Sequence, residues 1–218
     1  MKIKWIGHAC FAITAGDGTV IVTDPYEPGA YDGALGYGPI PVQPDIATVS
    51  HGHEDHGYVQ GLQGKPVVIE QGGPYEAKGI KFDTHSVFHD TSQGGERGTN
   101  TIICFTIDGV RLCHLGDLGH QLDAATVQAV GAVDVLFVPV GGHFTIDAAE
   151  ATKVVEILRP RIVVPMHYKT DKCGFPIETV DPFLQGKPDV QRPRSTEFEV
   201  EKDDLPAATK IVVLEHAA

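Results

Sequence analysis

A dense polar cluster placed directly after a short apolar run constrains this chain more than any other feature. Residues 46–50 read IATVS, which predicts a brief buried strand. The following HGHEDH contains His51, His53, Asp55 and His56. In a tight loop, imidazoles two residues apart can converge on one cation, while the aspartate and the last histidine face a second point nearby. A solvated polar loop is the alternative, but it would crowd four such groups with nothing to bind.

Four residues cannot complete two coordination spheres, so further ligands are needed at other strand ends. Three candidates fit: His89 ends the apolar run 80–88, Asp117 follows the run 112–116, and His167 follows the run 162–166. Imidazoles and carboxylates without thiolate suit zinc, and Mn²⁺ or Fe²⁺ suit the same donors. The sequence therefore predicts a metal site assembled from several strand ends.

The remaining histidines divide into alternative ligands, catalytic candidates and supporting residues. His85 shares a strand face with His89 and is an alternative ligand, although a bend at the strand end favours His89. His114 lies in an apolar run, which favours a core or supporting role. His120 and His143 lie near glycine-rich turns. They are candidates for a proton donor or an oxyanion partner, with support of the ligands as the alternative.

The apolar periodicity predicts strands first and a strand-helix alternation later. Asp108-Gly109 predicts a two-residue hairpin turn. A helix is expected from about 121 to 130, and a clearer one over 147–158, capped by Thr145 or Asp147 and stopped by Pro160. Residues 172–204 are expected to be a surface excursion. The predicted strands are 3–6, 10–14, 19–23, 46–50, 67–70, 79–88, 100–107, 110–115, 133–138, 162–165 and 210–214. No repeat or composition break divides the chain, so residues 1–218 are expected to form a single domain.

Charge and composition exclude several classes of partner. With 17 basic and 29 acidic residues the net charge is −12, which opposes general binding to nucleic acid or to anionic membranes. The four cysteines form no CxxC pair and are expected to be reduced core residues. No apolar stretch has the length of a signal peptide or a membrane span. We therefore expect a cytoplasmic protein with a small-molecule substrate, whose oligomeric state the sequence does not specify.

Taken in chain order, the HxHxDH motif, His89, the Gly116-Asp117 dipeptide and His167 resemble the metallo-β-lactamase superfamily. Shorter segments are similar to its cytosolic metal-dependent hydrolase branch, which includes the ascorbate-phosphate lactonases. These segments are Trp5-Ile-Gly-His8-Ala, Thr23-Asp-Pro25, residues 115–120, Pro139-Val-Gly-Gly142 and Thr145-Ile-Asp147. The resemblance implies an α/β fold, a four-layer αβ/βα sandwich of two mixed β-sheets with outer helices and a dinuclear metal site at one edge.

The resemblance also implies a role for each motif residue. It places one metal ion on His51, His53 and His89, and the other on Asp55, His56 and His167, with Asp117 bridging. Two divalent ions, zinc or alternatively Mn²⁺ or Fe²⁺, would then activate a water as hydroxide, and Asp55 would orient it. His8 and Asp24 resemble positions that line such a site from below, as supporting residues or as structural turns.

The expected function is metal-dependent hydrolysis of a small ester, lactone or phosphoester. Two alternatives stay open: a nucleic-acid phosphodiesterase or nuclease of the same fold, which the net charge and the lack of a Lys/Arg-rich segment oppose, and a non-catalytic metal-binding protein. Hydrolysis of β-lactams ranks lower because no secretory signal is present.

Two loops are expected to shape the pocket around the site. Arg97 lies in a glycine-punctuated loop beside His89, where it could clamp a substrate carboxylate or phosphate, or tie the loop to Asp90 or Asp117. The segments 26–41 and 169–193 carry aromatic residues that predict an apolar wall or loop anchors. These are Tyr31, Tyr37, Phe175 and Phe183.

Overall fold

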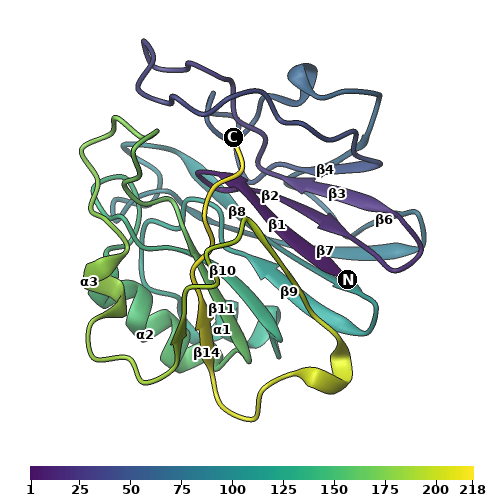
Figure 1. The fold of residues 1–218 in the computed structure, drawn as a ribbon. Coiled ribbons are helices and arrows are strands. Elements are labelled where there is room, and N and C mark those ends of the chain that lie inside the picture. Colours follow the sequence, from purple (N-terminus) through teal and green to yellow (C-terminus); the bar gives the residue numbers. More distant parts are fainter.

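Two β-sheets pack face to face in a computed structural model that describes residues 1–218 (Figure 1). The strands are β1 (Lys2–Gly7), β2 (Cys10–Thr14), β3 (Val20–Thr23), β4 (Ile46–Thr48), β5 (Val67–Ile69), β6 (Tyr75–Ala77), β7 (Ile80–Phe88), β8 (Thr99–Ile107), β9 (Val110–His114), β10 (Val135–Pro139), β11 (Ile162–Met166), β12 (Val190–Gln191), β13 (Glu197–Glu199) and β14 (Lys210–Val212). One sheet has the order β13-β1-β2-β3-β4-β5 and the other β12-β14-β11-β10-β9-β8-β7-β6. Each contains parallel and antiparallel pairs, which confirms the predicted mixed sheets.

The six-stranded sheet is apolar on both faces. In β2, Phe11 and Ile13 belong to the large core between the sheets, whereas Cys10 and Ala12 belong to a smaller core on the opposite face. This follows from the alternation of side chains along a strand. The smaller core is closed by loop residues such as Tyr37. The outer face of this sheet is thus covered mainly by loops, with only the short 3₁₀ turn Val59–Gly61 among them.

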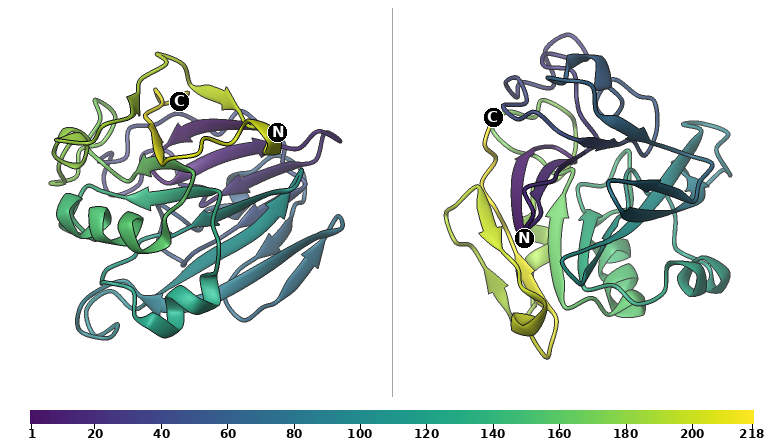
Figure 2. Two further views of the ribbon diagram at one scale, coloured as in Figure 1. Left: turned by 90° about the horizontal axis from the view of Figure 1, so that it is seen from below. Right: turned by 90° about the vertical axis from the view of Figure 1, so that its right-hand side faces the viewer.

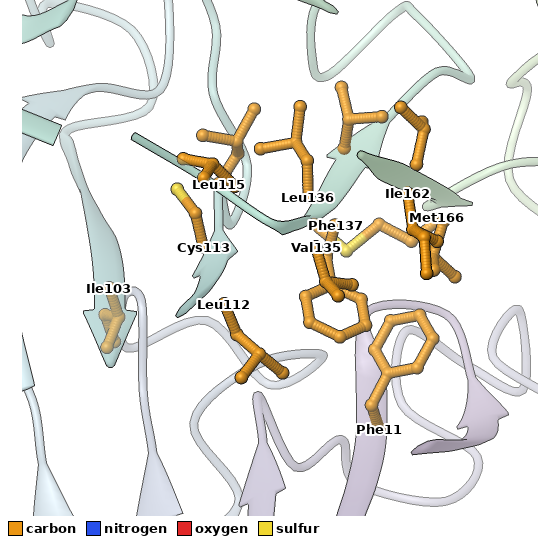
Figure 3. Close-up of a cluster of buried hydrophobic side chains, with 14 of the residues drawn as sticks. Phe11, Ile103, Leu112, Cys113, Leu115, Val135, Leu136, Phe137, Ile162 and Met166 are labelled. Atoms are coloured by element: carbon orange, nitrogen blue, oxygen red, sulfur yellow. The ribbon is translucent and has the colours of Figure 1, made fainter. Parts of the chain in front are cut away.

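The eight-stranded sheet carries the large core on one face and the helices on the other. Phe11 meets Phe137 of β10 with ring centroids 4.5 Å apart (Figure 3). Figure 2 shows α1 (Ala124–Val130) and α2 (Ala148–Leu158) on the side that faces away from the six-stranded sheet. Helix α2 packs through Ala151, Val154, Val155 and Leu158. The predicted α/β sandwich of two mixed sheets is confirmed, but its helices lie on one side only, and loops stand where the fourth, helical layer was expected over the six-stranded sheet.

Elements with a strong local sequence signal were predicted well, whereas short edge strands were not predicted. Asp147 caps α2 in a capping box, and Asp108-Gly109 joins β8 to β9 in a tight hairpin. The region 172–204, predicted as a surface excursion, contains α3 (Asp181–Leu184), β12, β13 and a second 3₁₀ turn (Lys202–Asp204). Strand β13 pairs with β1, and two or three residues are too few for a periodicity to show.

Two further observations concern the chain as a whole. All four cysteines are free and buried, as expected for small core residues. None of the helices combines the length and the apolarity that crossing a bilayer requires.

Candidate metal centre

Six strand ends bring the motif and its predicted partners to one edge of the sandwich. Carboxyl ends of neighbouring parallel strands meet at the same edge, where α/β proteins commonly bind ligands. Here β3 runs parallel to β4, and β9 and β10 run parallel to β11. The residues delivered are His8 after β1, Asp24 after β3, the loop 51–56 after β4, His89 after β7, Asp117 after β9 and His167 after β11.

Asp117 lies at the centre of the assembly. Its Oδ2 is 3.2 Å from His56 Nε2 and 3.3 Å from the Nε2 atoms of His89 and His167. His51 Nε2 lies 3.9 Å away. Ligand atoms on a tetrahedral cation with bonds of about 2.0–2.1 Å are themselves about 3.3 Å apart. Asp117 Oδ2 therefore lies about as far from His56, His89 and His167 as two ligands of one cation lie from each other.

The potential ligands form two groups beside Asp117. The open group consists of His51, His53 and His89, and the buried group consists of His8, Asp55, His56 and His167. Within each group the potential ligand atoms all lie within 4.8 Å of one another. His53 is exposed, whereas all four members of the buried group are buried. The structure thus brings all seven predicted metal ligands together and adds His8, which the sequence left open between support and a structural turn.

Unpaired polar atoms in this cluster fit a cation. His56 Nε2 and Asp117 Oδ1 are buried and have no hydrogen-bond partner, a condition that costs about 1–3 kcal/mol for a neutral group and more for a charged one. A divalent cation between the imidazoles and the carboxylates would supply the missing interaction. The donors are nitrogen and oxygen atoms without thiolate, a set that suits zinc, iron or manganese. The residues present therefore fit a metal site.

Asp24 and Ser50 orient two of the histidines from beneath. His56 Nδ1 donates to Asp24 Oδ2 at 2.8 Å. Ser50 Oγ donates to the same oxygen at 2.6 Å and lies 3.0 Å from His51 Nδ1, from which it can accept. These bonds leave the Nε2 lone pairs of both rings directed at the centre, the usual role of such carboxylate partners. Burial by itself raises the pKa of Asp24, but His114, His56 and Ser50 lower it by more than burial raises it, so the pKa lies below its usual value.

Burial and mutual contact set the protonation of the cluster. Burial lowers the pKa of His51 to about 3 and that of His8 to about 4. Both rings are therefore neutral at pH 7 and offer a lone pair. Burial by itself raises the pKa of Asp117, yet the imidazoles of His167 and His56 lower it well below its usual range. The carboxylate is therefore ionised and able to bind a cation.

The backbone is strained where it enters the site. His8, Asp24 and His167 have φ values of 53°, 38° and 50°, in the left-handed region that non-glycine residues rarely adopt. Gly116 also has a positive φ, and a Cβ there would overlap Asn100 and Ser50. Because the Asn100 side chain accepts from Asp117 N at 2.9 Å, the Gly116-Asp117 pair is held in one tight turn.

A cavity of about 420 Å³ opens over the cluster, a size suited to a small ligand. It is lined by Tyr31, His53, Asp55, His89, Arg97, Asp117, Phe144, His167 and Phe175. Tyr31 Oη donates to Asp55 Oδ1 at 3.1 Å, and His8 Nε2 lies 3.1 Å from Asp55 Oδ2. Asp55 is thus held from both sides at the floor of the cavity.

The two histidines expected to act in catalysis lie outside the cluster. His120 Nε2 accepts from Phe88 N at 3.1 Å and its Nδ1 donates to Gln121 O at 2.8 Å, so neither nitrogen is free to transfer a proton. His143 is exposed, and its ring packs edge-on against Phe144. It is Phe144, not His143, that lines the cavity. The structure thus places neither residue among the ligand groups or the cavity lining, and neither is given a role in the function proposed below.

His85 and His114 both lie outside the ligand groups. His85 is half-buried in β7 and does not join either ligand group. This agrees with the prediction that the bend after the strand favours His89. His114 is fully buried, and its ring nitrogens pair with Ala9 O and with Gly116 N. It is the core residue that the sequence predicted.

Sequence reasoning missed Ser50, Asn100 and Phe144. Ser50, just after β4, and Asn100, in β8, act through hydrogen bonds between segments far apart in the chain, and single polar residues give no sequence pattern. For Arg97, the structure shows which part of the residue holds the loop and which part is available to a ligand. Its backbone N–H donates to Asp90 Oδ2 at 2.8 Å, while its guanidinium lines the cavity and pairs only with Glu96.

Comparison with known proteins identifies the family. The sequence model of a protein family, described as "Beta-lactamase superfamily domain", matches residues 2–167 of this chain. A protein of Methanoculleus marisnigri named UPF0173 metal-dependent hydrolase is 31% identical over 193 residues, which cover 78% of this chain and 82% of that protein.

Solved structures agree with this result. A Thermotoga maritima protein, proposed to be a zinc-dependent hydrolase of the metallo-β-lactamase superfamily, is 38% identical with a TM-score of 0.80 over 98% of both chains. A metallo hydrolase from Ignicoccus hospitalis is 25% identical with a TM-score of 0.61, over 98% of this chain and 94% of that one. The chain therefore belongs to the metallo-β-lactamase superfamily, among relatives named metal-dependent hydrolases.

Proposed function

We propose that the protein uses two divalent cations, zinc in preference to Mn²⁺ or Fe²⁺, to hydrolyse a small ester, lactone or phosphoester. One cation would bind the open group through His51, His53 and His89. The other would bind Asp55, His56 and His167. The observation that carries the proposal is the place of Asp117 Oδ2, within 3.9 Å of histidines from both groups, where one oxygen can serve two cations.

Bound divalent cations lower the pKa of a coordinated water to about 7 and polarise a carbonyl or phosphoryl oxygen. The chain itself positions the reactants. Asp55 lines the cavity and is fixed by Tyr31 and His8, so it is placed to accept a hydrogen bond from the attacking water. Burial and the neighbouring Asp55 raise the pKa of Tyr31 above its ordinary value. Its phenol stays protonated and keeps donating.

Size and charge favour a small substrate over a nucleic acid. The cavity of about 420 Å³ holds a small molecule, and it contains a single Lys or Arg side chain, Arg97. A nuclease needs several cationic contacts along a backbone, which a chain of net charge −12 does not favour. Location in the cytoplasm, in keeping with the sequence, is part of the same proposal.

Metal analysis and a substrate panel test the proposal. The purified protein should contain close to two zinc ions per chain and should hydrolyse an aryl ester or a lactone. Chelation should abolish turnover, and zinc should restore it. Turnover of phosphodiesters alone, with competition by long nucleic acids at physiological salt, would support the nuclease instead. Two bound ions without turnover of any substrate would support a metal-binding protein.

A further inference from the structure

We propose that Arg97 binds a carboxylate of the substrate, so that the substrate is a small monoanion with an apolar body. This inference rests on the proposed function and specifies its substrate. Arg97 lines the cavity above the ligand groups, and its guanidinium lies over the ring of Phe144, another lining residue. Its one ion pair is with the adjacent Glu96, at 3.6 Å between Nη1 and Oε2, and the Glu96 side chain is 63% exposed. Arg97 has five N–H donors and only this long ion pair, so its guanidinium is available to bind an anion.

The loop that carries Arg97 is built on a single carboxylate. Asp90 Oδ1 accepts from Ser92 N and Gly94 N, each at 2.8 Å. Asp90 Oδ2 accepts from Glu96 N at 3.0 Å and from Arg97 N at 2.8 Å. Both oxygens are therefore used by the loop backbone and do not neutralise the guanidinium. The same bonds fix the backbone at Arg97, which gives its side chain a defined starting point.

An aromatic wall connects Arg97 to the floor of the cavity. The guanidinium carbon lies 5.7 Å from the centre of the Phe144 ring, within cation–π range. Phe144 and Phe175 meet edge to face at 5.5 Å, and Phe175 and Tyr31 meet in the same way at 5.3 Å. Tyr31 in turn bonds Asp55. The series runs from a cation, along an apolar surface, to the proposed metal ligands.

This arrangement defines the substrate by its chemistry. The scissile ester or lactone would lie over the ligand groups, the apolar body would lie against Phe144 and Phe175, and a carboxylate would reach Arg97. One guanidinium fork matches one carboxylate in two parallel hydrogen bonds. In a chain of net charge −12, an anionic substrate needs such a local positive site.

Two nearly isosteric esters test the anchor on the zinc-loaded protein. Water cleaves 3-acetoxybenzoate to acetate and 3-hydroxybenzoate, and it cleaves 3-carbamoylphenyl acetate to acetate and 3-hydroxybenzamide. They differ only in the charge of the group remote from the scissile bond. We expect kcat/KM to favour the carboxylate by about tenfold to a hundredfold, as a charge-assisted hydrogen bond allows. Arg97→Met should reduce the preference to about twofold or less, mainly through KM, and Arg97→Lys should restore part of it.

The matched control is Arg192→Met, which removes the same charge from an exposed side chain outside the cavity and should leave the preference unchanged. Calorimetric titration with 3-hydroxybenzoate and 3-hydroxybenzamide provides a readout without turnover. Binding that favours the carboxylate and is lost in Arg97→Met supports the anchor, even when neither ester is cleaved and ester hydrolysis fails. Equal preference in wild type and Arg97→Met overturns the anchor, even when both esters are cleaved and hydrolysis stands.

Discussion

The two ligand groups beside Asp117 differ in how far the fold itself determines them. All members of the buried group are enclosed by the sandwich, and the His8 and His56 side chains are 0% exposed. The open group includes an exposed ligand, His53. Each group contributes two residues to the cavity lining, but only the open group reaches solvent, through His53. The buried half is suited to holding a cation, and the open half to exchanging ligands and admitting substrate.

The two groups also differ in how many of their ligands are held by hydrogen bonds. In the buried group, His56 bonds Asp24, and Asp55 is held by His8 and Tyr31. In the open group only His51 has such a partner, Ser50, while His89 Nδ1 and, in the buried group, His167 Nδ1 are both without one. Partners of this kind fix ring orientation and raise metal affinity. We therefore expect the buried group, in which His56 and Asp55 are both held, to bind its cation more tightly than the open group does.

The largest effect is expected from Asp117→Asn, which removes the charge that both groups share. Loss of the common oxygen ligand should release both cations and lower kcat/KM by about a thousandfold or more, since residues that act as a unit fail together. Mass spectrometry of bound metal and steady-state kinetics measure this. Asp134→Asn, at a carboxylate that bonds Arg111 N away from the cluster, is the control. Retention of both cations in Asp117→Asn would contradict the bridging assignment.

His53→Ala should separate the two groups. The open group loses its exposed ligand while every buried ligand stays, so one cation per chain should remain, and activity should fall about a hundredfold. Competition with a chromogenic chelator measures the stoichiometry and both affinities. His143→Ala is a matched control, because that histidine is also exposed and lies outside both groups. If His53→Ala loses both cations together, the two groups do not bind independently.

Asp24→Asn should weaken the buried cation without removing a ligand. The amide keeps the shape of the carboxylate but orients His56 less strongly, and loss of such a partner typically costs about tenfold to a hundredfold in metal affinity. Ser50→Ala should act more weakly and on the open cation, since Ser50 contacts His51. Chelator competition on both variants checks the order. A larger loss at the open cation in Asp24→Asn would reverse the comparison.

The sequence predicted the ligands better than their surroundings. His51, His53, Asp55 and His56 stand together in the chain, and the buried runs before Asp117 and His167 showed that these would follow strand ends. Periodicity shows such runs because each strand is buried along its whole length. The histidine spacing and the buried runs together therefore indicated that the ligands share one edge of the sandwich.

The parts that could not be predicted depend on contacts between distant segments. His120 and His143 stood beside glycines in the sequence, as catalytic residues often do, but only the fold decides that backbone groups occupy the His120 ring. Phe144 enters the cavity because His143 before it has a positive φ and turns outward. Local sequence does not encode either outcome.

The smallest effect concerns His8, whose burial can be measured through the pH dependence of stability in the metal-free protein. Its folded pKa of about 4 lies below the ordinary value of 6.5, because burial disfavours the charged ring. The unfolded chain thus takes up a proton first as the pH falls, and stability present above pH 6.5 is lost toward pH 4. At pH 5 this loss is about 2 kcal/mol. Urea unfolding at pH 7.5 and pH 5 should therefore show a smaller loss in His8→Gln than in wild type, by about that amount. Equal losses would mean that His8 is as solvated as a free imidazole, and the distinction between a buried and an open group would fail at its most enclosed member.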